Sequence, residues 1–175
     1  MHFPIAFLSL ASGLDLLYGA ATFESTSKTV ASIYNVTPFL GDIAKASHFA
    51  NVLGLLTAIP AIFTGIGELL ALIKSNETQA TAKRGDKKAV SKSTNPKLGY
   101  GIAHAVVNEI AVIISVYNWW SRRNNTGLVP DSINILLSGL VLPGLLSAAF
   151  LGGILVYDHG VGVMRQEAAK KTKGQ

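Results

Sequence analysis

Residues 132–157 read SINILLSGLVLPGLLSAAFLGGILVY, a stretch that contains no charged side chain. A helix of about 20 apolar residues is long enough to cross the roughly 30 Å hydrocarbon core of a bilayer. The stretch is rich in leucine, glycine and alanine and does not alternate between apolar and polar residues, which favours a helix over a barrel strand. It therefore predicts a transmembrane helix.

Three further apolar stretches are long enough to span a bilayer, and each contains a single acidic residue. These are residues 2–23 with Asp15, residues 46–73 with Glu68, and residues 98–121 with Glu109. The first stretch has no basic residue at its start and holds an aspartate, so it does not read as a signal peptide. We predict an all-α fold, a four-transmembrane-helix bundle that forms a single membrane domain over residues 1–163.

The composition agrees with a membrane protein and excludes several classes of function. Hydrophobic residues make up 49% of the chain and charged residues only 14%, whereas about a quarter of a soluble domain is charged. The absence of cysteine excludes disulfides, thiolate metal sites and iron–sulfur clusters. No phosphate-binding loop, HExxH motif or nucleophile–base pattern is present, so we expect neither a hydrolase nor an NTPase; a redox role stays open.

The basic residues lie mainly in one connection and in the tail. Residues 74–97 form a polar segment with seven Lys or Arg, which we predict to be a mobile loop, and the tail at 164–175 adds four more. The opposite side has four: Lys28, Lys45, Arg122 and Arg123. The positive-inside rule then places both termini and the loop in the cytosol or its topological equivalent, which explains the basic charge better than a nucleic-acid partner does.

The predicted far side carries an aromatic and a mildly amphipathic segment. Trp119 and Trp120 mark the far membrane interface as part of an aromatic belt. Residues 24–45 are expected to include a short helix along the interface. Asn35 and Asn124 begin N-x-T triplets, where glycosylation is conceivable in a secretory compartment, although such triplets are common by chance.

Three histidines and a glutamate are predicted to gather at the loop side of the bundle. From its distance to Lys97, His104 lies about 10 Å inside the boundary, and Glu68 lies at about 9 Å. His2 opens the first helix on that side and His159 closes the fourth. We therefore predict a cofactor or metal site with His2, His104 and His159 as ligands, and place His48 at the far end.

Four polar residues are candidates to support that site. Glu68 matches the depth of His104, and Asn108 stands four residues after His104 on the same helical face. Asp15 and Glu109 lie deeper, about 18–20 Å from the boundary, where a charge is costly. We expect each of them to face the bundle interior, to be protonated or to find a partner. No Lys or Arg lies within the four stretches, so that partner must be histidine, a hydroxyl, an amide, water or a bound cation. A packing role between helices is the alternative.

Several motifs resemble a known family. HFPIA with Asp15 following, TGIGE, HAVVN and above all GGILVYDHGVGV resemble the predicted membrane proteins grouped as domain of unknown function 2231, over His2 to Val163. Family members usually open with a further His-Pro before the position of His2, so we expect either a longer natural N-terminus or a first ligand that is dispensable here. Many relatives have aspartate at the position of Glu68. Some relatives are fused to Rieske or cytochrome c modules, and this resemblance implies an association with redox proteins.

The sequence leaves three functions open. Two of them involve a bound group, and the third is a structural membrane subunit without cofactor. The first is electron transfer by b-type haem held between His104 and either His2 or His159, with a redox partner protein. The second is a binding or transport protein in which the histidine and carboxylate cluster holds Zn²⁺, Cu²⁺ or protons. The lipid bilayer is a partner in every case, and self-association stays open.

Overall fold

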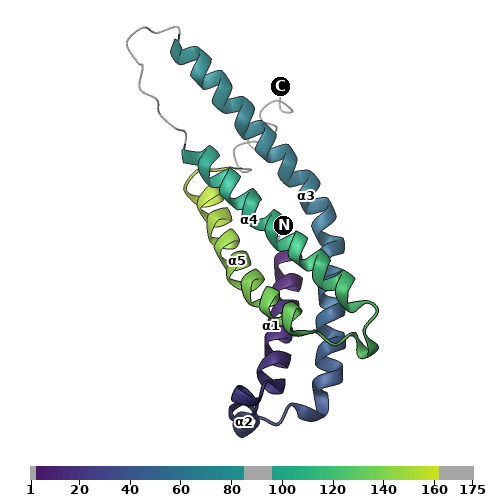
Figure 1. The fold of residues 1–175 in the computed structure, drawn as a ribbon. Coiled ribbons are helices and arrows are strands. Elements are labelled where there is room, and N and C mark those ends of the chain that lie inside the picture. Colours follow the sequence, from purple (N-terminus) through teal and green to yellow (C-terminus); the bar gives the residue numbers. More distant parts are fainter. Residues whose placement is uncertain (1–2, 85–95, 162–175) are drawn as a thin grey trace, which may run out of the picture. The chain divides into compact units, whose positions relative to one another are not determined.

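The computed structural model describes residues 3–84 and 96–161, without the side chains of residues 78–84. Every regular element in these ranges is helical (Figure 1). In chain order they are α1 (Phe3–Thr22), α2 (Glu24–Ile33), the short 3₁₀ helix η1 (Thr37–Phe39), α3 (Leu40–Arg84), α4 (Pro96–Arg122), the 3₁₀ helix η2 (Thr126–Leu128) and α5 (Ser132–Tyr157).

Four helical segments are long and apolar enough to span a membrane: Phe3–Thr22, Thr37–Glu77, Pro96–Arg122 and Thr126–Tyr157. They correspond to the four predicted spans. The predicted all-α class with four membrane-spanning helices is therefore confirmed. The side on which the termini lie is not part of this finding.

Helix α3 is longer than the apolar stretch that predicted it. It begins at Leu40 rather than at residue 46 and continues to Arg84 rather than ending at 73. Polar residues continue a helix beyond the hydrocarbon wherever no Pro or Gly intervenes, and Gly85 is the first glycine after Gly67. The predicted loop at 74–97 was therefore too long at both ends. Residues 85–95 and the predicted tail at 164–175 lie outside the described residues.

The connection after α1 is also more helical than expected. The short helix predicted within residues 24–45 is α2, and it ends at Ile33. Lys45 lies in α3, although the sequence placed it in the connection. Helix α5 begins with a reciprocal cap, because the backbone N–H of Asn134 donates to the Asp131 carboxylate and the N–H of Asp131 donates back to the Asn134 amide oxygen.

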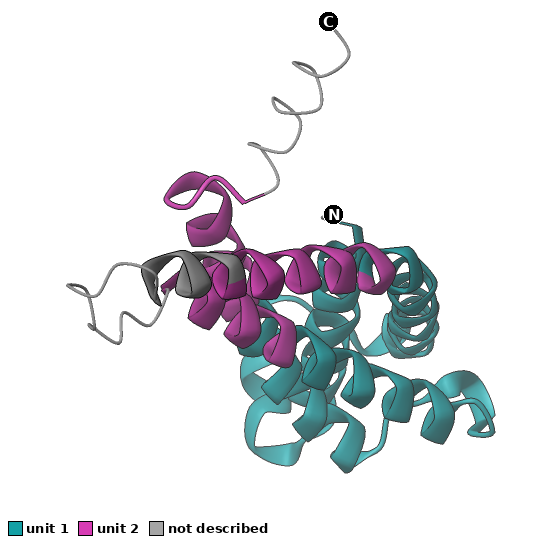
Figure 2. Cartoon of the chain, turned by 90° about the horizontal axis from the view of Figure 1, so that it is seen from above, with its two compact units in different colours: residues 1–61, 108–146 teal, residues 62–107, 147–175 magenta. Residues whose placement is uncertain are grey.

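The chain divides into two compact units, which are described separately (Figure 2). Unit 1 combines residues 1–61 with 108–146, and unit 2 combines residues 62–107 with 147–175. The division falls within α3, α4 and α5, so each of these helices contributes to both units. The prediction of a single domain stays a prediction.

Unit 1 has a small apolar core and a polar interior. Leu8, Ala111, Val141 and Leu145 form the buried apolar cluster. Ten polar or charged residues are buried among the described part of the chain, nearly as many as the buried apolar ones, while large side chains such as Ile113 are exposed. An apolar exterior over a hydrogen-bonded interior is the arrangement that a surrounding bilayer requires.

Candidate functional site

In unit 2, the ring of His104 is held against α5 by a hydrogen bond to the backbone of α5. The ring nitrogen Nδ1 lies 2.8 Å from the carbonyl oxygen of Ala148. A carbonyl can only accept, so Nδ1 carries a proton, and in the neutral ring Nε2 carries the lone pair. The ring lies over Gly152, where an added Cβ would stand 3.1 Å from His104 Cε1. The missing side chain of Gly152 is therefore what lets the imidazole reach α5.

His159 lies in the turn that ends α5. Gly160 has a φ of 64°, a left-handed conformation that glycine adopts without strain, and its N–H donates to Val156 O. The ammonium of Lys97, at the start of α4, donates to the carbonyl oxygen of His159 over 3.3 Å. The Nε2 atom of His159 is buried and has no hydrogen-bond partner among the described residues. Such an atom is expected to have a partner beyond the described residues, since an unmade buried hydrogen bond is costly.

The two imidazoles lie near the same part of α4. The ring of Tyr100 lies 5.6 Å from the ring of His159, centroid to centroid. Tyr100 and His104 are four residues apart in one helix, which places their side chains on the same face, one turn apart. In unit 2, His159 thus lies next to the first half of α4, which carries His104, and the combination of the two into one site stays a prediction; His2 lies outside the described residues.

Within residues 3–84 and 96–161, no group of three His, Asp or Glu side chains is arranged to hold a metal ion. Glu68 is half-buried on α3 in unit 2 and Asn108 is half-buried on α4. Their roles in supporting His104 stay predictions. The proton of His104 Nδ1 goes to a backbone carbonyl, which is one of the acceptors that a ligated histidine commonly uses.

Asp15 belongs to a different polar group, and the expectation that it has no cationic partner was wrong. In unit 1, Nη1 of Arg122 lies 2.8 Å from Asp15 Oδ1, and both side chains are almost fully buried. Ser47 also donates to Oδ1, and Ser138 donates to Oδ2 over 2.8 Å. The sequence placed Arg122 one residue beyond the third span, but a long side chain at a helix end reaches back into the bundle.

All five N–H groups of Arg122 are satisfied. Besides Asp15, Nη1 contacts the Ser47 hydroxyl, Nη2 donates to Ala44 O, and both Nε and Nη2 donate to Leu128 O. Leu128 has a φ of 58°, which is strained for a leucine. The guanidinium donates two hydrogen bonds to this one carbonyl oxygen, and these offset the strain.

The polar group extends through amides to the start of α5. Asn118 Nδ2 donates to the Ser138 hydroxyl, and Asn134 Nδ2 donates to Asn118 Oδ1 and to the Ser121 hydroxyl. These contacts tie together α1, α3, α4 and α5 within unit 1. The members of this group form hydrogen bonds with one another. We therefore interpret the group as a structural network that fixes how the helices pack.

Of the outcomes expected for Glu109, an interior position is wrong, because this side chain is exposed on α4. A protonated carboxyl or a partner stays a prediction. His48 was placed at the far interface, but it is buried, with Nδ1 lacking a hydrogen-bond partner among the described residues. The sequence reasoning also missed Arg122 and its serine and asparagine partners. Asp15 itself could have indicated Arg122, because a carboxylate in the middle of a span is expected to pair with a nearby cation, here one at a helix end.

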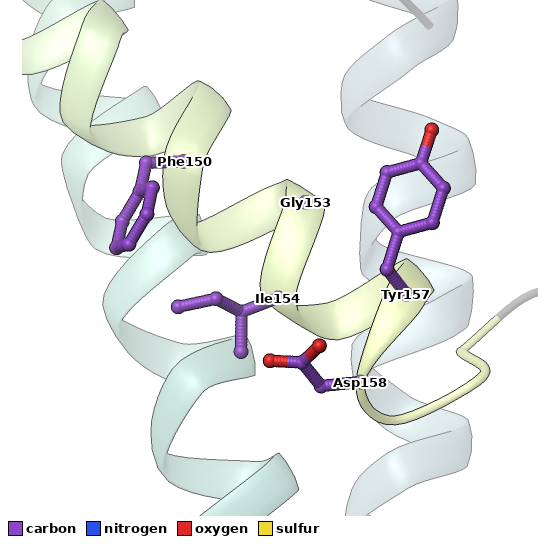
Figure 3. A pocket seen from close by; sticks show the side chains of 5 residues that line it. All are labelled: Phe150, Gly153, Ile154, Tyr157 and Asp158. Carbon is purple, nitrogen blue, oxygen red and sulfur yellow. The ribbon is translucent and has the colours of Figure 1, made fainter.

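A shallow hollow of about 420 Å³ lies along α5 in unit 2 (Figure 3). Phe150, Gly153, Ile154, Tyr157 and Asp158 line it, and the side chains of Phe150 and Ile154 lie on the same side of the helix. Neither His104 nor His159 lines it. We therefore treat it as part of the apolar outer surface and not as the candidate site.

Comparison with known proteins gives one match. No curated protein and no solved structure is similar enough to match the chain. A family model described as "Predicted membrane protein (DUF2231)" matches residues 1–165, which is nearly the whole chain. The motifs that suggested this family in the sequence lie within the matched range. The chain belongs to the DUF2231 family of predicted membrane proteins.

Proposed function

We propose that unit 2 binds a b-type haem through His104 and His159 and that the protein carries electrons within the membrane. The observation that carries the proposal is the state of the two Nε2 atoms. The hydrogen bond from His104 Nδ1 to Ala148 leaves the lone pair on Nε2, and the buried Nε2 of His159 has no partner among the described residues. Both imidazoles thus suit ligation to a metal through Nε2.

The number of donors favours haem over a bare metal ion. A protein zinc site needs three or four side-chain ligands, and no such group forms among the described residues. Haem brings four nitrogen donors of its own, so two histidines complete its coordination. The histidine-only donor set therefore fits haem iron better than Zn²⁺. Haem would supply a one-electron carrier, with its potential set by ligands and burial.

The chain's own contribution is to hold the two ligands. Ala148 O fixes the ring orientation of His104, and Gly152 leaves room for that ring. Lys97 holds the backbone of His159, and Tyr100 lies against its ring. A hydrogen bond on the far nitrogen raises the basicity of a ligating histidine and strengthens the metal bond.

Absorption spectroscopy tests the proposal. The full chain, purified in detergent from haem-sufficient cells, should show sharp α and β bands after reduction with dithionite. His104→Ala and His159→Ala should each lose the bands or their low-spin character, whereas His48→Gln, in unit 1, should keep them. If the unaltered chain binds no haem but retains stoichiometric zinc or copper by elemental analysis, the metal-ion alternative replaces haem. If neither group is retained, the site does not bind a cofactor.

We also propose that both termini and the segment around residues 85–95 face the cytosol or its equivalent. Eleven basic residues against four support this orientation. In oriented vesicles, protease should cut this segment from the same side from which tags on both termini are accessible. Opposite accessibility of the tail and the segment would contradict the orientation.

A further inference from the structure

Glu109 begins an otherwise apolar outer stripe of α4. Four residues, Ala111, Ser115, Asn118 and Arg122, recur at helical spacing and are buried, so they form the inner face. Ile113, Val116 and Trp120 are exposed, and with Glu109 they form the opposite stripe. In α4, Glu109 stands thirteen residues from both Pro96 and Arg122, at the midpoint of the helix.

A carboxyl group at this position is costly in a bilayer. Asp15, the other carboxylate well inside a span of unit 1, is fully engaged by Arg122, Ser47 and Ser138. Among the described residues, none forms a hydrogen bond or ion pair with the side-chain carboxyl of Glu109. An acidic side chain at mid-bilayer is costly, and polar groups there are expected to have partners.

We propose that the outer stripe of α4 docks a transmembrane helix of another protein that presents a Lys or Arg at mid-bilayer depth to Glu109. The choice of occupant follows from charge. Within the described spans, the basic residues Lys45, Lys74, Lys97 and Arg122 lie toward helix ends or are already engaged, so a second copy offers no cation at this depth. Two copies meeting through this stripe would instead bring two carboxyl groups together, which disfavours ionisation of both.

The stripe also has the composition of a helix-docking face. Ile113 is 59% and Val116 44% exposed, and these β-branched side chains, one and two turns after a single carboxylate, give a partner helix an apolar surface with one polar contact. In hydrocarbon such a contact fixes the register of two helices, because any other register leaves the charge unpaired.

Host peptides in vesicles test the proposal. The full chain, labelled for energy transfer, is reconstituted with a leucine-based transmembrane peptide that carries one central lysine, or with the same peptide carrying a central leucine. The lysine peptide should associate at least tenfold more tightly. Glu109→Leu should abolish the difference, Glu109→Asp should keep most of it, and Glu24→Gln, an exposed carboxylate outside the spans, should leave it unchanged.

Two results would overturn the proposal. Equal association of both peptides with the unaltered chain would mean that the carboxyl group faces lipid in its neutral form. Energy transfer between two labelled copies that disappears in Glu109→Leu would identify a second copy as the occupant. Circular dichroism of each variant in the same vesicles checks that the helices are retained.

Discussion

The guanidinium of Arg122 and the carboxylate of Asp15, which are separated by 107 residues in the chain, form a buried ion pair inside unit 1. Removing one partner of a buried pair leaves the other charge without compensation. The pair therefore makes the clearest predictions about the stability of this protein.

Arg122→Met should destabilise the protein by about 3–5 kcal/mol, because Asp15 then stays buried without its cation. Unfolding by a denaturing detergent, followed by circular dichroism, measures the loss. Arg123→Met is the matched control. Arg123 is the exposed neighbour that stacks over Trp120, so its loss should cost about 1 kcal/mol or less.

The double variant Asp15→Leu with Arg122→Met should be more stable than Arg122→Met alone, since it removes the uncompensated charge together with its partner. Strictly additive losses would show that the two side chains are not energetically coupled.

Leu128→Gly should be neutral or stabilising, because glycine adopts the φ of 58° without the cost of about 1–2 kcal/mol that a side chain carries. Leu128→Val should destabilise, since a β-branched residue tolerates positive φ least. The order of unfolding midpoints in detergent checks this. A valine variant as stable as the glycine variant would mean that the loop does not hold this conformation in solution.

Gly152→Ala should displace His104. The new Cβ would stand 3.1 Å from Cε1 of His104, so the ring must shift and its hydrogen bond to Ala148 must lengthen. Nitrogen NMR of ¹⁵N-histidine-labelled protein measures the change. The unaltered protein should show the Nδ1–H tautomer of His104, and the Gly152→Ala variant should show exchange between the two tautomers.

Gly153→Ala is the control for this change, since an added Cβ at Gly153 meets nothing within 4 Å. It should leave the His104 spectrum unchanged and raise helix stability by about 0.5–1 kcal/mol. Identical spectra for both alanine variants would show that Gly152 does not set the position of the ring.

Gly54→Ala should destabilise unit 1 by about 1–3 kcal/mol through overpacking. Its Cβ would stand 2.5 Å from Cδ2 of Leu8 and 3.2 Å from the backbone nitrogen of Leu8, and Leu8 is 2% exposed and cannot move aside. Gly13→Ala on α1, with open space around the new Cβ, should be neutral or slightly stabilising. Equal unfolding midpoints for the two variants would argue against the close approach of α1 and α3.

The sequence by itself determined the number of spanning helices and their approximate positions. Apolar length is a local property, so the charge-free run from Ser132 to Tyr157 was enough to identify α5. The end of α3 was misplaced because a helix does not stop where its apolar residues stop. The rise per residue also predicts that His104 and His159 lie toward one end of the bundle, and this stays a prediction.

Only the tertiary structure decided which way each side chain points. The residue pattern of a single helix does not say which neighbouring side chains each of its faces contacts. Packing of α4 turned Arg122 toward Asp15 and Glu109 away from the interior, and the sequence predicted neither. The acceptor for His104 Nδ1 was likewise set by α5, where Gly152 lets the ring approach Ala148 O. Long-range contacts of this kind depend on neighbours distant in sequence, so the local pattern of residues does not contain them.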